Sequence, residues 1–237
     1  IMDLRGKIGS FAYLQWSTDT GNSEYGKLVA ETNELSSEIS QKLVFVDVEW
    51  LKMPDEEAQK LMEAPELAKY KHYLESARQY KDHVLEEKQE QIMSAKSVTG
   101  RSAWVRYFDE TLGSAKFELD GEELSEQEVL SKLHEIDRKL RKRAHASLTK
   151  KFNELSRTLT FVFNTVLADK STNDKLRKYE NWIDSRNLAN ETDAETVEAL
   201  ISSVTDKYAL VQRYYKLKKN LLGLEEMKDY DRYAPII

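Results

Sequence analysis

Apolar residues recur every three to four positions along most of this chain, which is the period of an α-helix with one buried face. The first long stripe begins at Pro65 and ends near Gly100. Its members are Leu67, Tyr70, Leu74, Ala77, Tyr80, Val84, Ile92 and Ala95. Pro65 suits the first turn of a helix, where its missing N–H costs nothing. Pro54 with three acidic residues behind it predicts a shorter helix, because carboxylates favour the positive N-terminal end.

Residues 43–50 carry two patterns at once. Val44, Val46, Val48 and Trp50 alternate as in a strand, whereas residues 25–41 have helical spacing. We predict that the helix continues through residues 43–50.

One short β-hairpin is predicted near residues 116–122, where Asp120-Gly121 is a strong signal for a two-residue turn. Ser125 and Glu128 follow as a capping box, in which each side chain accepts a hydrogen bond from the backbone of the other. A helix of about 60 Å is expected from there if it is unbroken. Its apolar face comprises Val129, Leu133, Ile136, Leu140, Ala144, Leu148, Phe152, Leu155, Leu159, Val162 and Val166.

Two more helices are expected before the C-terminus. The first starts at a capping box of Thr192 and Glu195 and ends at the candidate cap Gly223; the second is short and ends before Pro235. The apolar face of the first comprises Val197, Leu200, Ile201, Val204, Tyr208, Val211, Tyr215 and Leu217. The predicted fold is all-α, an array of long antiparallel helices with one short hairpin. We expect residues 1–115 and 116–237 to be two regions of one continuous helical unit.

Composition supports this fold and excludes several classes of function. Eight glycines and three prolines in 237 residues leave few turns, which favours long helices over many strands. The absence of cysteine excludes disulfide scaffolds, thiol catalysis and thiolate metal sites, and fits a reducing compartment. No apolar run approaches the roughly 20 residues that span a bilayer, and the first residues lack the features of a signal peptide. We predict a cytoplasmic location, and the net charge of -6 disfavours nucleic acid and anionic membranes as partners.

His134-Glu135 resembles the start of a helical zinc site, in which a second histidine follows four residues after the first. Position 138 is an arginine, and a guanidinium cannot donate a lone pair to a metal. His72 and His83 are eleven residues apart, as are His134 and His145, so the members of each pair would be separated by about 16 Å along a helix. We therefore predict no catalytic residue and no metal ligand in this chain.

The strongest charge feature is a basic cluster, which could follow the phosphates of an RNA. Its helix also carries five acidic residues, however, and no aromatic side chains are interleaved for base stacking. A solvated helix face that pairs with acidic neighbours is favoured. The cluster comprises Arg138, Lys139, Arg141, Lys142, Arg143, Lys150 and Lys151.

The C-terminal region offers a second group of candidates. Tyrosines beside lysines can line a binding groove, although such tyrosines more often pack at the edge of a core. Asp229 and Asp231 are candidate acids, but neither their separation nor their pKa follows from sequence. The substrate-binding residues are therefore unassigned. The tyrosines and lysines are Tyr208, Tyr214, Tyr215, Lys216, Lys218 and Lys219.

Three segments resemble the oligoendopeptidase F branch of the thimet-oligopeptidase-like zinc peptidases. They are YLQWSTDTGN at residues 13–22, FELDGEELSEQEVLSKLHEIDRKLRKRAH at residues 117–145, and the region from residue 185 to 235. The last is the most specific. It contains Arg-Xaa-Leu-Ala-Asn at 186–190, Arg-Tyr-Tyr-Xaa-Leu-Lys at 213–218 and Tyr-Asp-Xaa-Tyr-Xaa-Pro at 230–235.

The resemblance implies a helical peptidase with a deep channel that admits short, unfolded peptides. In that family zinc is held by two histidines of a His-Glu-Xaa-Xaa-His motif and a downstream glutamate, and the motif glutamate activates the metal-bound water. Those residues lie outside the matched segments, so we expect the zinc-binding catalytic half to be absent from residues 1–237. The chain would be the N-terminal helical part of a zinc metalloendopeptidase and inactive alone. Its implied partners are the C-terminal catalytic half and an oligopeptide substrate.

Two other classes of function stay open. A free-standing helical scaffold for protein–protein interaction would share this architecture, and RNA binding through residues 138–143 would show an affinity that falls steeply with salt. If the chain is part of a peptidase, we expect one face of the helix after Ser125 or Thr192 to line the channel. An apolar face left uncovered would favour self-association.

Overall fold

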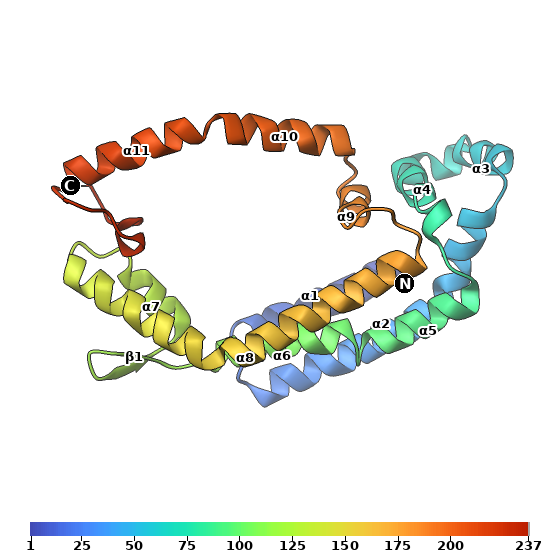
Figure 1. The fold of residues 1–237 in the computed structure, drawn as a ribbon. Helices are drawn as coiled ribbons and strands as arrows, with labels where there is room; N and C mark the ends of the chain where they lie inside the picture. Colours follow the sequence, from blue (N-terminus) through green and yellow to red (C-terminus); the bar gives the residue numbers. More distant parts are fainter. Residues whose placement is uncertain (237) are drawn as a thin grey trace. The chain divides into compact units, whose positions relative to one another are not determined.

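The computed structural model describes residues 1–236, which are mainly helical, with a single two-stranded antiparallel sheet among them (Figure 1). The predicted all-α class with one short hairpin is confirmed. No helix within residues 1–236 has both the length and the apolar character needed to cross a membrane. The longer helices are α1 (Met2–Ser17), α2 (Ser23–Lys52), α5 (Glu87–Ser97), α6 (Arg101–Gly113), α8 (Arg138–Leu176), α10 (Ala194–Asp206) and α11 (Tyr208–Leu221).

The chain forms two compact units, each assembled from two separate stretches of sequence. Unit 1 contains residues 1–106 and 164–197, and unit 2 contains residues 107–163 together with the chain from 198 onward. The division into regions 1–115 and 116–237 stays a prediction.

Unit 1 is built around α2, which packs against α1 and α5. The side chain of Asn22 starts α2, because its Oδ1 accepts hydrogen bonds from the backbone N–H groups of Glu24 and Tyr25 at 3.0 and 3.3 Å. The helix runs to Lys52, so the prediction for residues 43–50 is confirmed. Val48 and Leu51 lie one turn apart and are both buried, whereas Val46 points to solvent.

The stripe from Pro65 to Gly100 does not form one helix, and the prediction is wrong there. Pro65–Tyr70 is a 3₁₀ helix, α4 is Lys71–Arg78, and a second 3₁₀ turn at Lys81–His83 precedes α5. The N–H of Glu86 donates to Gln89 Oε1 at 3.1 Å in a capping box, which starts a new helix where the stripe suggested continuity. The short helix after Pro54 is confirmed as α3 (Asp55–Met62).

Unit 2 contains the predicted hairpin, with strands β1 (Phe117–Leu119) and β2 (Glu122–Leu124). Asp120 and Gly121 both have positive φ, at 55° and 90°, as a tight two-residue hairpin turn requires. Phe117 and Leu119 face inward and pack in one cluster with Val129, Ala144 and Leu148. The hairpin thus covers α7 (Glu126–Lys132) and the N-terminal half of α8.

The single long helix predicted after Ser125 is two helices, which corrects that prediction. The capping box of Ser125 and Glu128 is present, but α7 ends at Lys132. Asp137 then starts α8, since its Oδ1 accepts a hydrogen bond from the N–H of Lys139 at 2.8 Å. His134 and Glu135 lie in the break between the two helices and not within a helix.

The helix predicted between Thr192 and Gly223 is also divided, at Lys207. Its N-terminal cap is Asp193 and not Thr192, because Asp193 Oδ1 accepts from the N–H of Thr196 at 2.6 Å. The helix ends at the predicted glycine: Leu222 is the C-cap, and Gly223 follows it with a φ of 63°. The N–H groups of Gly223 and Leu224 bond back to Asn220 and Lys219, the pattern that closes many helices. A preceding short helix, α9, spans Asp184–Ala189, and the C-terminal short helix is a 3₁₀ turn at Asp229–Asp231.

Candidate functional site

The four histidines each interact with a different partner and do not converge on one point. No group of three or more histidine, aspartate or glutamate side chains within residues 1–236 is arranged to hold a metal ion. The donors present in the described chain therefore do not fit zinc. His72 Nε2 lies 2.9 Å from Glu191 Oε2, His83 Nδ1 lies 2.7 Å from Arg177 O, His145 Nε2 lies 2.6 Å from Asp229 Oδ2, and the His134 ring stacks on Tyr233 with centroids 4.7 Å apart.

Unit 2 has a buried ionic cluster around Asp231, whose side chain is inaccessible to solvent. Arg138 donates from Nη2 to Oδ2 at 2.8 Å and from Nε to Oδ1 at 3.0 Å. Arg141 donates from Nη2 to Oδ1 at 2.9 Å, and its own side chain is 4% exposed. The cluster joins the first turn of α8 to the C-terminal segment, more than 90 residues away in sequence.

The protonation of Asp231 follows from these contacts. Burial by itself would raise the pKa of this carboxyl, because charge is poorly solvated inside a protein. Hydrogen bonds from Arg138, the N–H of Lys228 and Arg141 outweigh burial and lower the pKa of Asp231 to about 2. Asp231 is therefore ionised at neutral pH. Both of its carboxylate oxygens accept hydrogen bonds from arginines of α8, which anchors the C-terminal segment to that helix.

Most of the basic cluster predicted from sequence is paired with carboxylates, as expected for a helix face beside acidic neighbours. Besides the two arginines bound to Asp231, Arg143 Nε lies 2.7 Å from Asp120 Oδ1 at the hairpin turn. Lys150 pairs with Glu118 at 3.3 Å, and Lys151 pairs with Glu154 at 2.8 Å. Arg143 and Lys150 are thus paired with the hairpin, and Lys151 is paired within α8.

The tyrosines and lysines near residue 215 do not share one environment, because some are buried and others are exposed. Lys218 is 5% exposed and donates from Nζ to the backbone oxygen of Arg232 at 2.7 Å, so it fastens α11 to the C-terminal segment. Tyr214 and Tyr215 contact each other edge to face with ring centroids 5.2 Å apart. Tyr208 and Tyr214 are exposed and stay available to a partner.

A cleft of about 400 Å³ lies within unit 1, between α2, residues 80–90 and the C-terminal part of α8. Arg177 and Glu90 form a two-pronged ion pair in its wall, with Nη1–Oε1 and Nη2–Oε2 distances of 2.7 and 2.8 Å. Arg177 also donates to the backbone oxygen of His83 at 3.1 Å, and the His83 ring stacks on Tyr179 with centroids 3.8 Å apart. Sequence analysis missed this cluster, because its members are spread over almost 100 residues.

Two carboxylates of this cleft have pKa values that are shifted in opposite directions. Burial tends to raise the pKa of Glu90, but hydrogen bonds from Arg177 and the N–H of Leu85 lower it below its usual value. Burial raises the pKa of Asp47, and the positive charge of Arg5 compensates in part. Glu90 therefore serves to hold the cleft wall, whereas Asp47 is a less strongly paired acid beside it.

Residues 49–117 match the model of a protein family described as Oligopeptidase F. Over 97% of its length the chain is 27% identical to the group B oligopeptidase PepB of Streptococcus agalactiae, and over its full length it is 25% identical to oligopeptidase PepF of Bacillus subtilis. The chain is thus similar to oligopeptidases of this type over nearly its whole length. The resemblance seen in its C-terminal motifs is confirmed.

The chain spans 39% of PepB and 36% of PepF, well under half of either relative. Its fold is also that of solved relatives. The crystal structure of oligoendopeptidase-F from Enterococcus faecium superposes with a TM-score of 0.88 at 24% identity, over 98% of this chain and 47% of that one. The two units described above therefore belong to a fold found within larger proteins.

Proposed function

We propose that this chain is the N-terminal helical part of a zinc metalloendopeptidase that hydrolyses short oligopeptides inside a channel. The observation that carries the proposal is the similarity over 97% or more of the chain to oligopeptidases of which it spans less than two-fifths. Zinc is implied by the family, but the chain has no His-Glu-Xaa-Xaa-His sequence, and its histidines are engaged one by one in separate contacts. The zinc ligands would therefore come from the rest of the polypeptide.

The role of the present residues is then to enclose and position peptides. The two ionic clusters support this role. Their carboxylates are bound to arginines, so the clusters hold α8 in place and leave no free acid or base for catalysis. As part of the same proposal, one face of α8, or the polar faces of α10 and α11, line the channel and limit the size of the peptide that enters. The parent enzyme would act in the cytoplasm, where the absence of cysteine is no disadvantage.

The gene provides the first test. Its reading frame should continue past the codon for Ile237 and encode a His-Glu-Xaa-Xaa-His motif with a downstream glutamate. A stop codon at that point would instead favour the free-standing helical scaffold, whose support is the large exposed apolar surface of α10 and α11.

Activity provides the second test. The purified chain should not cleave a fluorogenic oligopeptide, whereas the product of the complete gene should cleave it and lose that activity when a chelator removes zinc. A variant of the complete product with the first motif histidine replaced by alanine is the matched control for contaminating peptidases. Chelator-sensitive cleavage by residues 1–237 alone would refute the proposal.

A further inference from the structure

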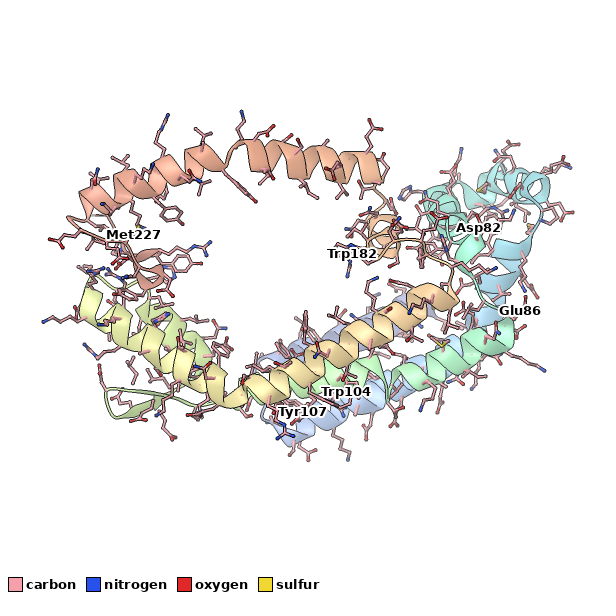
Figure 2. All side chains as sticks on the ribbon, in the orientation of Figure 1. Asp82, Glu86, Trp104, Tyr107, Trp182 and Met227 are labelled. Carbon is pink, nitrogen blue, oxygen red and sulfur yellow. The ribbon has the colours of Figure 1, made fainter. Side chains whose placement is uncertain are left out.

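Helices α10 and α11 expose an unusual amount of apolar surface. Every residue from 198 to 214 is exposed, whereas α8 buries Ala144, Leu148 and Val162. Side chains project from α10 and α11 on both sides of the ribbon (Figure 2). Helices of this length are marginal in water without packing partners, so their stability depends on a surface that covers them.

The exposed apolar residues of α10 lie on one side of the helix. On α10, Leu200, Ile201 and Val204 share one face by their helical spacing and are 64%, 53% and 49% exposed. The opposite side of α10 carries Glu195, Ser202 and Asp206. One side of α10 is thus apolar and unpacked, and the other is suited to water.

On α11 the apolar surface is wider. Leu210, Tyr214, Leu217 and Leu221 form one stripe, all of them at least half exposed. Tyr208 and Val211 begin a second, adjacent stripe and are also exposed. Polar residues fill the remaining half of the helix: Gln212, Arg213, Lys216, Lys219 and Asn220. Lys218 lies between the two stripes and is buried against the C-terminal segment, so the exposed remainder of this apolar arc is the part that lacks a neighbour.

We infer that this face, defined as Leu200, Ile201, Val204, Leu210, Val211, Tyr214, Leu217 and Leu221, is the docking surface for the remaining polypeptide of the peptidase. The inference rests on the proposed function and assigns the surface through which the two parts join. The relatives match the chain through α10 and α11 and have more than half of their length outside the match. That additional length can supply the several apolar elements that the wide arc requires.

A second copy of the chain fits the surface less well. In a symmetric pair of copies the same patch meets itself across a two-fold axis, which covers one stripe of each helix and leaves the second stripe of α11 in water.

The absence of cysteine makes the inference testable by thiol labelling. Four single substitutions place a thiol on the docking face or away from it. Leu200→Cys and Leu217→Cys probe the face, and Ser202→Cys and Lys216→Cys are the matched controls on the opposite sides of the same two helices. All four positions are exposed, so none of the substitutions removes a buried side chain of this chain. Circular dichroism checks helicity, and Ile201→Cys and Tyr214→Cys replace any face variant that fails to fold.

The rate of reaction with a water-soluble maleimide is measured in residues 1–237 and in the product of the complete gene, with each labelled peptide identified by mass spectrometry. In residues 1–237 all four thiols should react at similar rates. In the complete product the two face thiols should react at least about tenfold more slowly, because labelling then requires local opening, while the controls change by less than about twofold.

Several outcomes would overturn the inference. Face thiols that react as fast as the controls in the complete product would show that the remaining polypeptide leaves the surface uncovered. Protection in residues 1–237 that grows with protein concentration would assign the surface to a second copy. Protection that needs phosphatidylglycerol vesicles would assign it to a membrane, and slow labelling of dilute residues 1–237 would show that the chain covers the face itself.

Peptide cleavage by the same complete product separates this inference from the proposed function. Protected face thiols without chelator-sensitive cleavage would leave the docking surface standing and reject the peptidase. Cleavage with unprotected face thiols would do the reverse. A gene that ends at Ile237 would reject both.

Discussion

The two units are each fastened by an arginine–carboxylate cluster that joins residues roughly 90 positions apart, but the clusters differ in burial. In unit 2 the Asp231 side chain is inaccessible to solvent and binds two guanidinium groups. In unit 1 the side chains of Glu90 and Arg177 are 13% and 24% exposed. The carboxylate is thus fully buried in unit 2, although Arg138 is 42% exposed, and partly hydrated in unit 1.

This difference determines what the loss of one partner should cost. A charge left unpaired in a buried site cannot recover its hydration, whereas a partly exposed arginine can turn toward water. Arg138 is the first residue of α8, and Arg177 follows its last residue. The two clusters therefore fix opposite ends of one long helix with different strengths, and substitutions can rank them.

The largest effect is expected for Asp231→Asn. The amide keeps the size of the side chain but leaves Arg141 buried without its counter-charge, so the free energy of unfolding should fall by about 3–5 kcal/mol. Urea denaturation followed by circular dichroism measures the change. Asp229→Asn, two residues away and exposed, is the control and should cost less than about 1 kcal/mol. Equal losses for the two variants would contradict the assignment of Asp231 as the buried anchor.

The same anchor predicts how stability depends on pH. The pKa of Asp231 is about 2 in the folded chain against 3.8 for an ordinary aspartate, so its stabilising contribution is present above pH about 4 and is lost as the pH falls toward about 2. The difference in unfolding free energy between the parent chain and Asp231→Asn should therefore shrink across this range. A difference that stays constant down to the lowest pH would show that Asp231 has no depressed pKa.

A smaller effect is expected in unit 1 for Glu90→Gln. The substitution removes the charge that accepts both Arg177 hydrogen bonds, but water can reach the freed guanidinium, so the cost should be about 1–3 kcal/mol. Glu87→Gln is the control, since Glu87 lies exposed on the same helix and accepts a hydrogen bond from Gln91. If Glu90→Gln were as costly as Asp231→Asn, burial would not be what distinguishes the two clusters.

The smallest effect is expected for Glu118→Gln. Glu118 and Lys150 pair across 3.3 Å with side chains 69% and 66% exposed. Hydration and side-chain entropy offset most of the attraction in such a pair, and the loss should be below about 0.5 kcal/mol. Unfolding at low and high salt checks it, and a loss above that of Glu90→Gln would reverse the ranking.

Local signals predicted most of the elements correctly. The turn at Asp120-Gly121, the cap at Ser125, the helix end at Gly223 and the helical course of residues 43–50 all depend on neighbours a few positions away. Besides the cap expected at Thr192, the errors are breaks within long apolar stripes, after Arg78, after Lys132 and at Lys207. At the first two of these breaks a capping side chain, Gln89 or Asp137, marks the start of a new helix although the apolar spacing continues.

The candidate sites were less predictable. Asp231, Arg138 and Arg141 were each conspicuous in sequence, but nothing local indicated that they meet. The cluster of Glu90, Arg177 and His83 carried no sequence signal at all. The family resemblance was visible in the motifs at 186–190, 213–218 and 230–235, which are short stretches of contiguous residues.

By itself, then, the sequence determined the helical class, the hairpin, the caps and the family likeness, because periodicity and capping act over one or two turns of the chain. Which carboxylates are buried against which arginines, and which apolar faces stay uncovered, was decided by the tertiary structure. Burial is the joint result of segments more than 90 residues apart, and no local pattern specifies it.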